Sequence, residues 1–459
     1  MNFKSAASML VFALTAAWAS ASAPCRIEIV DKSCGWPVPM VELQTLHDVR
    51  FVTDNAGVIA FDLPELMGRE TWFEIKGDGY AVKKDGFGYA GFRFTPEPGQ
   101  THRVEVERTI IARRVGRVTG GGLFGESQKL GAEASWQESG VLGQDSIQNA
   151  TYQGKLFWLW GDTTLPRYPL GVFDSTCATT APQPLTSLEP PLRMPLAYFR
   201  DKQGIPKGVA KMAGQGPTWI SAMTTVPDAQ GREHLVATYV KIHNPLHIYR
   251  QGLAVWDDAA ESFKSLRVLW EESAGSERPP PAPDGHSVKW TDDAGKAWML
   301  FCTPFPTMRC PAAFEAWSDS NSWERLTPPR NLLAAQTGDK VRPHGGSIAW
   351  NAWRKRWVAV FVQAGGEPSP LGEVWYAEAR SPLGPWGPAV KVLTHENYSF
   401  YNPQLHPEFT PENSPILFFE GTHSGDFARN PVLTPRYDYN QLLYRLDLDD
   451  PRLSPARQE

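Results

Sequence analysis

Short stretches in which apolar and polar residues alternate recur along most of this chain. Alternation with a period of two predicts strands that bury one face, whereas a helix needs apolar residues three and four positions apart. Gly, Pro, Asn and Asp separate the stretches, as expected where strands end in turns. The pattern therefore predicts an all-β protein.

Residues 24–110 form the first predicted unit, a small β-sandwich. Its stretches include CRIEIVD, VRFVTDNAGVIAFDL, TWFEIKGDGYAV and HRVEVERT, and only 63–67 could form a helical turn. The segment Asp54-Asn55-Ala56-Gly57 predicts a hairpin turn between two of the strands. Residues 111–135 are rich in glycine and are expected to be a linker.

A different theme repeats from about residue 136 to residue 450. Each repeat combines a segment of small and polar residues with a second strand rich in Trp, Phe or other apolar residues, and most continue into a third strand. The leading segments are 143–152, 216–226, 284–292, 343–351 and 401–409, the second strands 155–163, 233–242, 297–304, 356–363 and 415–422, and the third strands 251–258, 313–319, 372–379 and 441–448. Five repeats of this kind predict a five-bladed β-propeller. Unrelated hairpins in a larger sandwich or a β-helix are the alternative.

The first 21 residues have the features of a signal peptide. Lys4 supplies a positive charge, residues 6–18 are apolar but too short to span a bilayer, and 19–21 (ASA) provide a small-residue cleavage site. No later stretch approaches 18 apolar residues, so we expect a secreted or periplasmic protein without a transmembrane segment.

The five cysteines fit an oxidising compartment. Cys25 and Cys34 are predicted to form one disulfide, as are Cys302 and Cys310, because each pair is close in sequence across an expected loop. Cys177 is left over and is expected to be a buried apolar residue.

The amino-acid composition limits the classes of ligand that the protein is expected to bind. The net charge of −5 without basic blocks argues against nucleic-acid binding. The 18 Trp and 13 Tyr residues favour a polysaccharide or oligosaccharide partner, because exposed aromatic faces stack on sugar rings. Filling the gaps between blades is the structural alternative for each Trp. No cofactor is expected, although the sequence leaves open a structural Ca²⁺ or Na⁺ ion in the propeller channel.

Functional side chains should converge at one mouth of the propeller, where the first strand of each blade begins. The leading segments place polar and aromatic residues there at comparable positions. Those expected to contact a ligand are Trp219, Asp284, His286, Arg342, His344, Tyr401, Asn402 and His406.

Two carboxylates of the first repeat are the candidate catalytic pair. Glycoside hydrolysis needs one carboxylic acid to protonate the leaving oxygen and a second carboxylate to activate water or attack the sugar. Asp145 and Asp162 flank the first hairpin and are expected at similar heights, with Asp145 as base or nucleophile. Glu373 and Glu420 are further acid candidates. A turn-capping role is the structural alternative for the aspartates, and a solvated strand end for the glutamates.

Histidines allow another chemistry. His286, His344 or Tyr401 could abstract a proton from a uronic acid sugar, as polysaccharide lyases do. The spacing of the histidines lacks a metal-binding motif, so no metal site is predicted.

Two family resemblances follow from motifs in the chain. Residues 35–39 (GWPVP), 53–57 (TDNAG) and 79–80 (GY) resemble the carboxypeptidase regulatory-like, or transthyretin-like, sandwich, which implies an accessory module. Residues 143–146 (GQDS) with 157–163 (FWLWGDT) resemble the start of five-bladed furanosidase-type propellers.

Within those propellers, the most similar group is one formerly classed as a domain of unknown function and now linked to endo-D-arabinanase activity. Residues 373–377 (EVWYA) and 381–386 (SPLGPW) are similar to segments across that clan. The resemblance implies a carbohydrate-active propeller in which Asp145 and Asp162 match acidic positions of the first blade. The sequence thus favours an exported glycoside hydrolase, with a lyase or a non-catalytic carbohydrate-binding protein of the cell envelope as alternatives.

Overall fold

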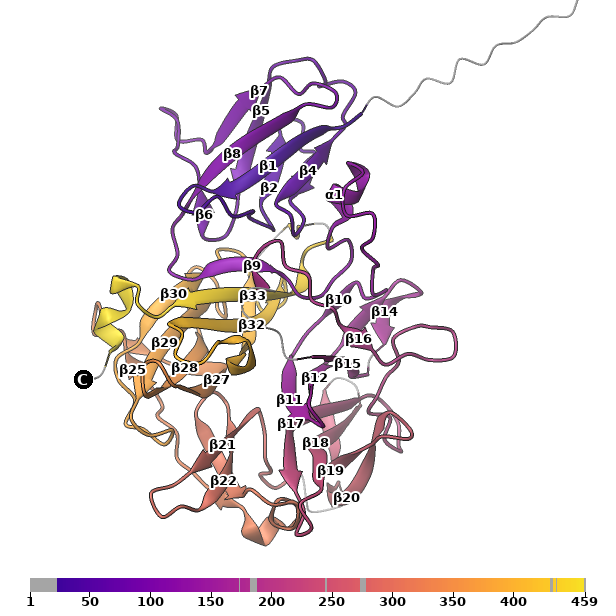
Figure 1. The fold of residues 1–459 in the computed structure, drawn as a ribbon, viewed down its shortest axis with the longest axis vertical. Coiled ribbons are helices and arrows are strands. Elements are labelled where there is room, and N and C mark those ends of the chain that lie inside the picture. Colours follow the sequence, from indigo (N-terminus) through magenta and orange to yellow (C-terminus); the bar gives the residue numbers. More distant parts are fainter. Residues whose placement is uncertain are drawn as a thin grey trace, which may run out of the picture.

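A computed structural model describes residues 23–172, 174–181, 188–243, 246–272, 278–429, 432–434 and 436–457. A small β-body lies at one end and a larger ring of sheets at the other (Figure 1). The predicted signal peptide lies outside the described residues. Among those described, no helix is both long and apolar enough to cross a membrane.

The small body is a sandwich of two four-stranded sheets, ordered β4-β1-β8-β6 and β3-β2-β5-β7. Its strands are β1 (Cys25–Asp31), β2 (Glu42–Thr45), β3 (Arg50–Val52), β4 (Val58–Phe61), β5 (Thr71–Lys76), β6 (Tyr80–Ala81), β7 (Gly91–Phe94) and β8 (Thr101–Arg108). Alternate residues of β1, such as Ile27 and Ile29, are fully buried between the sheets. The period-two pattern of the sequence produces this core.

The turn at Asp54–Gly57 does not form the predicted hairpin. It joins β3 to β4, which belong to different sheets. Gly57 has a φ of 68°, and a Cβ there would meet the backbone of Ile29 and Val38. The turn signal was therefore correct, but the chain crosses between layers because the next apolar run pairs with β1.

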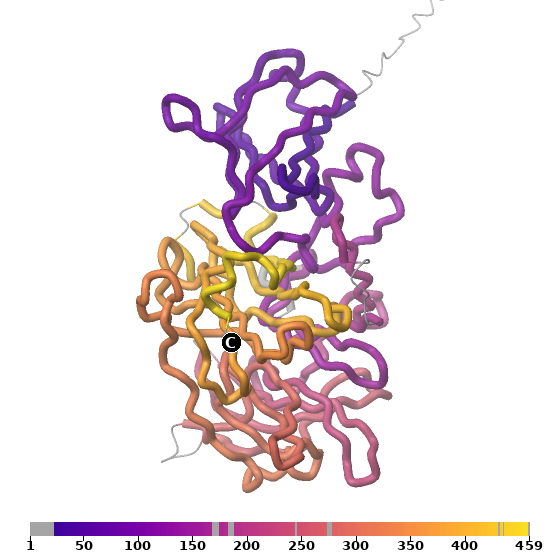
Figure 2. The backbone as a smooth tube through the Cα atoms, turned by 60° about the vertical axis from the view of Figure 1, so that its left-hand side comes forward, coloured from indigo at the N-terminus to yellow at the C-terminus, as the bar shows by residue number. Residues whose placement is uncertain are grey.

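The larger body is a five-bladed propeller, so the predicted fold class is confirmed. In Figure 2 its chain runs from magenta through orange to yellow below the indigo sandwich. Each blade is a four-stranded antiparallel sheet. From the innermost strand outward, the blades are β11 (Gln148–Tyr152), β12 (Lys155–Trp160), β15 (Thr176–Thr180), β16 (Ala197–Tyr198); β17 (Thr218–Pro227), β18 (Glu233–His243), β19 (His247–Asp257), β20 (Ser262–Glu271); β21 (His286–Thr291), β22 (Ala297–Cys302), β23 (Pro306–Pro311), β24 (Glu324–Arg325); β27 (Pro343–Asn351), β28 (Arg356–Gln363), β29 (Glu373–Ala379), β30 (Val390–Thr394); and β31 (Ser399–Leu405), β32 (Ile416–Ser424), β33 (Tyr439–Asp447), β9 (Arg113–Arg117).

The last blade is completed by a strand from the start of the domain. β9 pairs with β33, with Gly116 opposite Leu443, and this pairing closes the ring. The predicted linker 111–135 therefore carries a propeller strand as well as helix α1 (Gly125–Lys129).

Smaller elements decorate the blades. They are the three-stranded sheet of β10 (Gly143–Gln144), β13 (Thr163–Leu165) and β14 (Tyr168–Val172), the pair β25 (Leu332–Leu333) and β26 (Lys340–Val341), helix α2 (Phe314–Ser318), and the 3₁₀ turns Ser320–Ser322, Pro407–Phe409 and Pro451–Ala456. Helix α2 replaces the strand expected at 313–319, because Phe314 and Trp317, three positions apart, share one helix face and Trp317 is fully buried. The third strand of that blade is β23 instead.

Neither predicted disulfide forms. Cys25 opens β1, while Cys34 lies in the turn beyond its far end, so about 20 Å of extended strand separates them. Cys302 and Cys310 lie on antiparallel neighbours β22 and β23 but pack on opposite faces of their sheet. All five cysteines are free, and Cys177 is buried as expected.

Buried hydrogen bonds fasten the sandwich to the propeller. The side-chain amide of Asn55 donates to the carbonyl oxygens of Arg117 (2.9 Å) and Leu192 (3.1 Å), and its oxygen accepts from the Arg117 N–H (2.9 Å). Nearby, Asp54 accepts from the Ser127 N–H at 2.7 Å. The turn of the sandwich thus reaches the strand that closes the ring.

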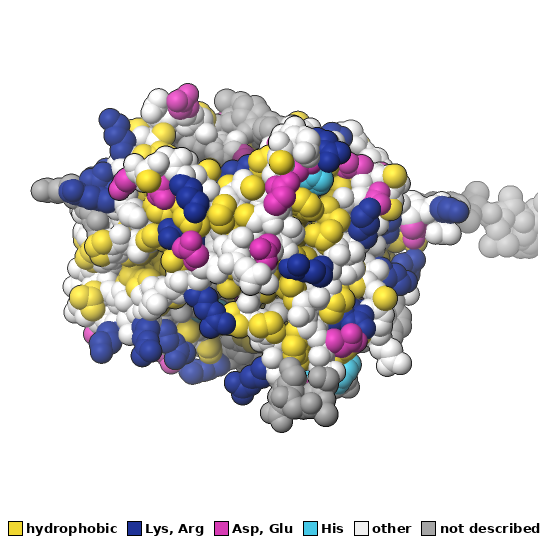
Figure 3. Space-filling view, turned by 90° about the horizontal axis from the view of Figure 1, so that it is seen from below, with side chains coloured by type: hydrophobic (Ala, Val, Ile, Leu, Met, Phe, Trp, Pro, Cys, Tyr) yellow, Lys and Arg dark blue, Asp and Glu magenta, His cyan; other side chains and the backbone are white. Residues whose placement is uncertain are grey.

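The end of the propeller seen from below carries charges of both signs. Lys, Arg, Asp and Glu are interspersed with apolar side chains there (Figure 3). Neither sign covers this face alone.

Candidate active site

A backbone irregularity recurs where the innermost strands begin. Register shifts occur at Ser221/Thr224 in β17, Pro343/Gly346 in β27 and Tyr401/Gln404 in β31. In four blades a residue with left-handed φ follows a polar residue at this point. These pairs are Asp145-Ser146, Ser221-Ala222, Asp284-Gly285 and Tyr401-Asn402, with φ of 51°, 54°, 78° and 50° at the second member. Such bulges re-aim the side chains beside them, and they are common next to active sites.

The bulges of the fifth and first blades are joined through their side chains. The Tyr401 hydroxyl donates to Asp145 Oδ2 at 3.0 Å, and the Asn402 amide donates to Ser146 Oγ at 3.0 Å. The Ser146 N–H in turn donates to the Thr422 hydroxyl at 3.1 Å. Asp145 is therefore fixed by contacts across the seam between two blades.

Gly161 makes room for the Asp145 carboxylate. Its N–H donates to the Asp145 carbonyl at 2.8 Å, and a Cβ at this position would collide with Asp145 Oδ1. The sequence needs glycine here because of this close approach.

Asp162 directly follows Gly161 and lies beside the same centre. Tyr439, at the start of β33, donates its hydroxyl to the Asp162 carbonyl at 3.0 Å and also interacts with the Asp145 carboxylate. Asp162 Oδ1 is buried without a well-aligned hydrogen bond in the described part of the chain. The Trp219 indole lies near enough to stabilise the charge of Asp162, although its N–H is not aligned for a hydrogen bond either.

Both carboxyl groups hold their protons unusually tightly. Burial, reinforced by the negative charge of Asp162, raises the pKa of Asp145 to about 7, against the opposing effect of the Tyr401 and Tyr439 hydroxyls. Burial also raises the pKa of Asp162 to about 6; Trp219 opposes this shift and the charge of Asp174 adds to it. Two such groups exchange a proton near neutral pH, as acid–base catalysis requires.

The tyrosines remain proton donors. Burial and the nearby Asp145 charge raise the pKa of Tyr401 and Tyr439 far above the ordinary range. Their hydroxyls are therefore protonated at any working pH, and they orient the carboxylates rather than accept protons.

Asp284 occupies the corresponding bulge of the third blade and is exposed. Its Oδ1 accepts from the Ser221 hydroxyl at 2.5 Å and from the Gly285 N–H at 2.9 Å. The second and third blades are thus joined at their bulges much as the fifth and first are.

The predicted histidines have different surroundings. His286 is buried, and burial together with the charge of His406 lowers its pKa to about 4. His406 is fully buried, accepts from the Asn149 amide at 2.8 Å and contacts Glu420 Oε2 at 3.1 Å. His344 is exposed beside Arg342; partial burial and the Arg342 charge lower its pKa.

The structure brings together five of the predicted residues, namely Asp145, Asp162, Trp219, Tyr401 and Asn402. Glu420 and His406 instead form a buried pair between the last and first blades. Glu373 opens the third strand of its blade, where it forms a buried ion pair with Lys391 at 2.6 Å. None of these three is exposed enough to meet a ligand directly.

Sequence reasoning missed Tyr439, Ser221 and Asp174. Tyr439 begins a third strand, a position that the repeat pattern assigns to the outer part of a blade. Ser221 is two residues from the predicted Trp219, and only the bulge reveals that Ser221 matches Asp145. Asp174 follows a segment in which the repeated strand pattern of the sequence cannot be recognised. Its charge still reaches Asp162.

Comparisons with known proteins give remote structural similarity only. No protein-family model matches the sequence, and no curated protein is detectably similar. Among solved structures, an exo-1,5-α-L-arabinanase from a bovine ruminal metagenomic library has 10% identity and a TM-score of 0.39, over 67% of this chain and 94% of that one.

An arabinanase from Bacillus subtilis has 10% identity and a TM-score of 0.35, over 67% of this chain and 95% of that one. An N-acetylgalactosamine deacetylase from F. plautii has 8% identity and a TM-score of 0.38, over 68% of this chain and 91% of that one. Since these proteins differ in reaction, function has to be argued from the site itself.

Proposed function

We propose that this protein is an exported glycoside hydrolase that cleaves a polysaccharide or oligosaccharide with Asp145 and Asp162. The observation that carries the proposal is the shared, largely buried environment of these two carboxyl groups, whose pKa values are raised to about 7 and about 6, close to neutral pH. Neither forms an ion pair with Lys or Arg among the described residues, so neither charge is already neutralised.

The pair supports a division between acid and base. The carboxyl that keeps its proton donates it to the glycosidic oxygen as the bond to the anomeric carbon breaks, and the ionised partner activates water or attacks that carbon. Because Asp145 has the higher pKa, it is better suited to the acid role, the reverse of the role expected from sequence. The two groups titrate as a coupled pair, so the apparent values belong to both together.

Other residues of the mouth supply positioning. Tyr401 and Tyr439 hold the Asp145 carboxylate, and the partly exposed Trp219 offers an aromatic face for a sugar ring beside Asp162. Asp284 and Ser221 provide a second polar group at the same level of the propeller. A bound glycan would then lie across the bulges of several blades.

The test measures reducing-end release from a panel of neutral and acidic glycans by Asp145→Asn and Asp162→Asn. Each variant should lose at least about 100-fold in kcat/KM, the scale typical of acid–base catalysis. Asp293→Asn, at an exposed turn of the third blade, is the matched control and should retain full turnover. Wild-type turnover in both site variants would reject the carboxylate assignment.

The lyase alternative has weaker support. A tyrosine base needs an accessible phenol with a lowered pKa, whereas burial raises the pKa of Tyr401 and its hydroxyl already serves Asp145. Release of an unsaturated product that absorbs ultraviolet light would nevertheless support the lyase alternative. Glycan binding without turnover would favour a purely carbohydrate-binding protein.

A further inference from the structure

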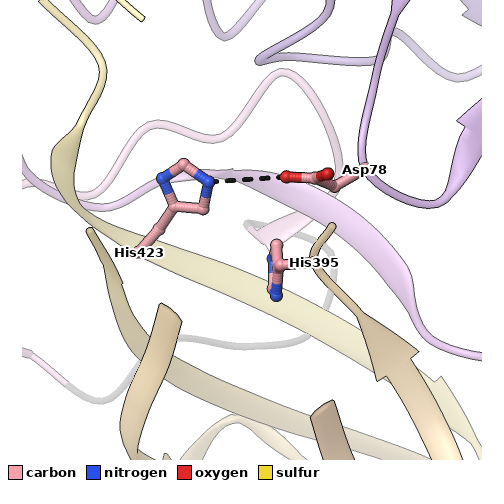
Figure 4. A group of neighbouring side chains, drawn as sticks. All are labelled: Asp78, His395 and His423. Atoms are coloured by element: carbon pink, nitrogen blue, oxygen red, sulfur yellow. Dashed lines mark ion pairs between the residues drawn. The ribbon is translucent and has the colours of Figure 1, made fainter. Parts of the chain in front are cut away.

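A second cluster of potential ligands lies between the two domains. Asp78 comes from the loop between β5 and β6 of the sandwich, His395 follows β30, and His423 lies on β32 (Figure 4). Each offers one ligand atom, and the three atoms lie within 4.8 Å of one another. We propose that these residues bind a divalent transition metal of the Zn²⁺ class, which joins the sandwich to the propeller.

The spacing of one pair of ligand atoms is close to that of a tetrahedral site. His423 Nε2 and Asp78 Oδ2 face each other at 3.7 Å, too far apart for a hydrogen bond. Zn²⁺ bonds of 2.0–2.2 Å place two ligand atoms about 3.3 Å apart, so a small contraction would suffice. Two imidazoles and one carboxylate form a mixed nitrogen and oxygen set, which favours Zn²⁺ over Ca²⁺ or Mg²⁺.

The surrounding hydrogen bonds orient the groups that would bind the ion. The Glu396 N–H donates to Asp78 Oδ1 at 3.1 Å, which orients the carboxylate and leaves Oδ2 toward His423. His395 Nδ1 is 3.3 Å from the Gly372 carbonyl and Nε2 is 3.1 Å from the Tyr444 hydroxyl. Whichever nitrogen binds, the other has a polar neighbour that fixes the ring, as is usual for metal-bound histidines.

The two histidines are buried where the domains meet: His395 and His423 are 0% and 3% exposed.

Arg114 is a cation whose charge acts on Asp78 and so could oppose a metal. Its guanidinium, however, donates to the carbonyl oxygens of Pro39 (3.0 Å) and Asp78 (2.6 Å) and to the Tyr444 hydroxyl (3.0 Å). The Arg114 guanidinium therefore bonds to the main-chain carbonyl of Asp78 and forms no recorded hydrogen bond to its carboxylate. In the described chain, the His423 ring is the carboxylate's one recorded ion-pair neighbour.

An ion at this place would be accessible. Asp78 and His423 line a cavity of about 890 Å³ between the domains, together with Tyr80 and Tyr398. Water from the cavity can provide the fourth ligand of a tetrahedral ion, and the cavity gives the metal a route of entry.

The experiment titrates Zn²⁺ into chelator-treated full-length protein by calorimetry, with metal content measured by mass spectrometry and Co²⁺ absorption as a report of tetrahedral geometry. Wild type should bind one equivalent tightly and unfold at a higher temperature with Zn²⁺ present. Asp78→Asn, which keeps an oxygen for the Glu396 N–H, should lose that equivalent and the temperature shift. His423→Gln should behave in the same way.

The control variant is His247→Gln. His247, His243 and Glu272 form an exposed cluster with similar spacing. An adventitious ion bound at this surface cluster would be lost in His247→Gln. Full Zn²⁺ binding in Asp78→Asn, loss of binding in His247→Gln, or no tight equivalent in wild type would each overturn the proposal. Preference for Ca²⁺ over Zn²⁺ would overturn the metal class. If His423→Gln fails to fold, Asp78→Asn still decides, because its shape is unchanged.

Discussion

The Tyr401 hydroxyl donates a hydrogen bond of 3.0 Å to Asp145 Oδ2 and so connects the fifth blade to the first at the mouth of the propeller. The two residues are far apart in sequence, but each directly precedes a residue with left-handed φ, which lies just before the innermost strand β11 in one blade and within β31 in the other. This relationship makes Tyr401 a positioning residue for Asp145, and a substitution of Tyr401 is a direct way to change the pKa of Asp145.

Removing the Tyr401 hydroxyl should change the pH dependence of the proposed hydrolase activity. The hydrogen bond favours ionised Asp145, so Tyr401→Phe should raise the pKa of Asp145 above about 7. If Asp145 is the acid, the alkaline limb of the kcat/KM profile should move to higher pH. An unchanged profile with wild-type turnover would show that Asp145 does not control the rate. Tyr398→Phe is the matched control, because the Tyr398 hydroxyl bonds to Thr434 and not to Asp145. It should leave the alkaline limb in place.

Asp145 should destabilise the protein at alkaline pH. Its pKa is raised from 3.8 in the unfolded chain to about 7, so the folded state binds more protons and stability falls as pH rises between these values. Asp145→Asn should therefore increase the free energy of unfolding at pH 8 by roughly 1–3 kcal/mol, allowing for partial exposure. The gain should shrink on acidification toward pH 4. Urea unfolding at several pH values measures this, and an equal effect at every pH would contradict the burial argument.

Gly161→Ala should reduce activity more than stability. The added methyl group collides with Asp145 Oδ1 and must displace the carboxylate. Displacements of about 1 Å can cost about 100-fold in rate. Steady-state kinetics with a thermal melt would separate the two effects. Gly86→Ala, where a Cβ meets nothing within 4 Å, is the control and should match wild type.

Asn55→Ala should loosen the sandwich from the propeller. The substitution leaves the buried Arg117 N–H and the carbonyl oxygens of Arg117 and Leu192 without their partner. Each unsatisfied buried group costs about 1–3 kcal/mol, so a loss of at least about 2 kcal/mol is expected in chemical denaturation. Exposed Asn397→Ala should change stability little. An equal effect of both variants would mean that Asn55 does not hold the domains together.

The sequence predicted the architecture because the repeats are periodic and their strands alternate. It also singled out Asp145, Asp162 and Tyr401, which the structure brings to one centre. It misplaced Glu373, Glu420 and His406, because a charged residue near a strand end can pair inside a seam as readily as face solvent. The left-handed bulges were invisible, since Ser146 and Ala222 carry no glycine signal.

The disulfide predictions failed for a related reason. Spacing along the chain does not say which face of a sheet a cysteine occupies, and Cys302 and Cys310 occupy opposite faces. The cluster of Asp78, His395 and His423 was likewise beyond sequence reasoning, because Asp78 comes from the sandwich and the two histidines from the propeller.

The closure of the ring by β9 also bears on how the chain is made. During synthesis Arg114 leaves the ribosome long before Tyr444, its partner 330 positions later. Until the last blade exists, β9 is an unsatisfied edge that could recruit a strand from another copy. The opposite edge of β9 is already covered by the sandwich, because the Arg114 and Arg117 N–H groups donate to Tyr80 and Asn55, so the edge that awaits β33 is the one left exposed during synthesis.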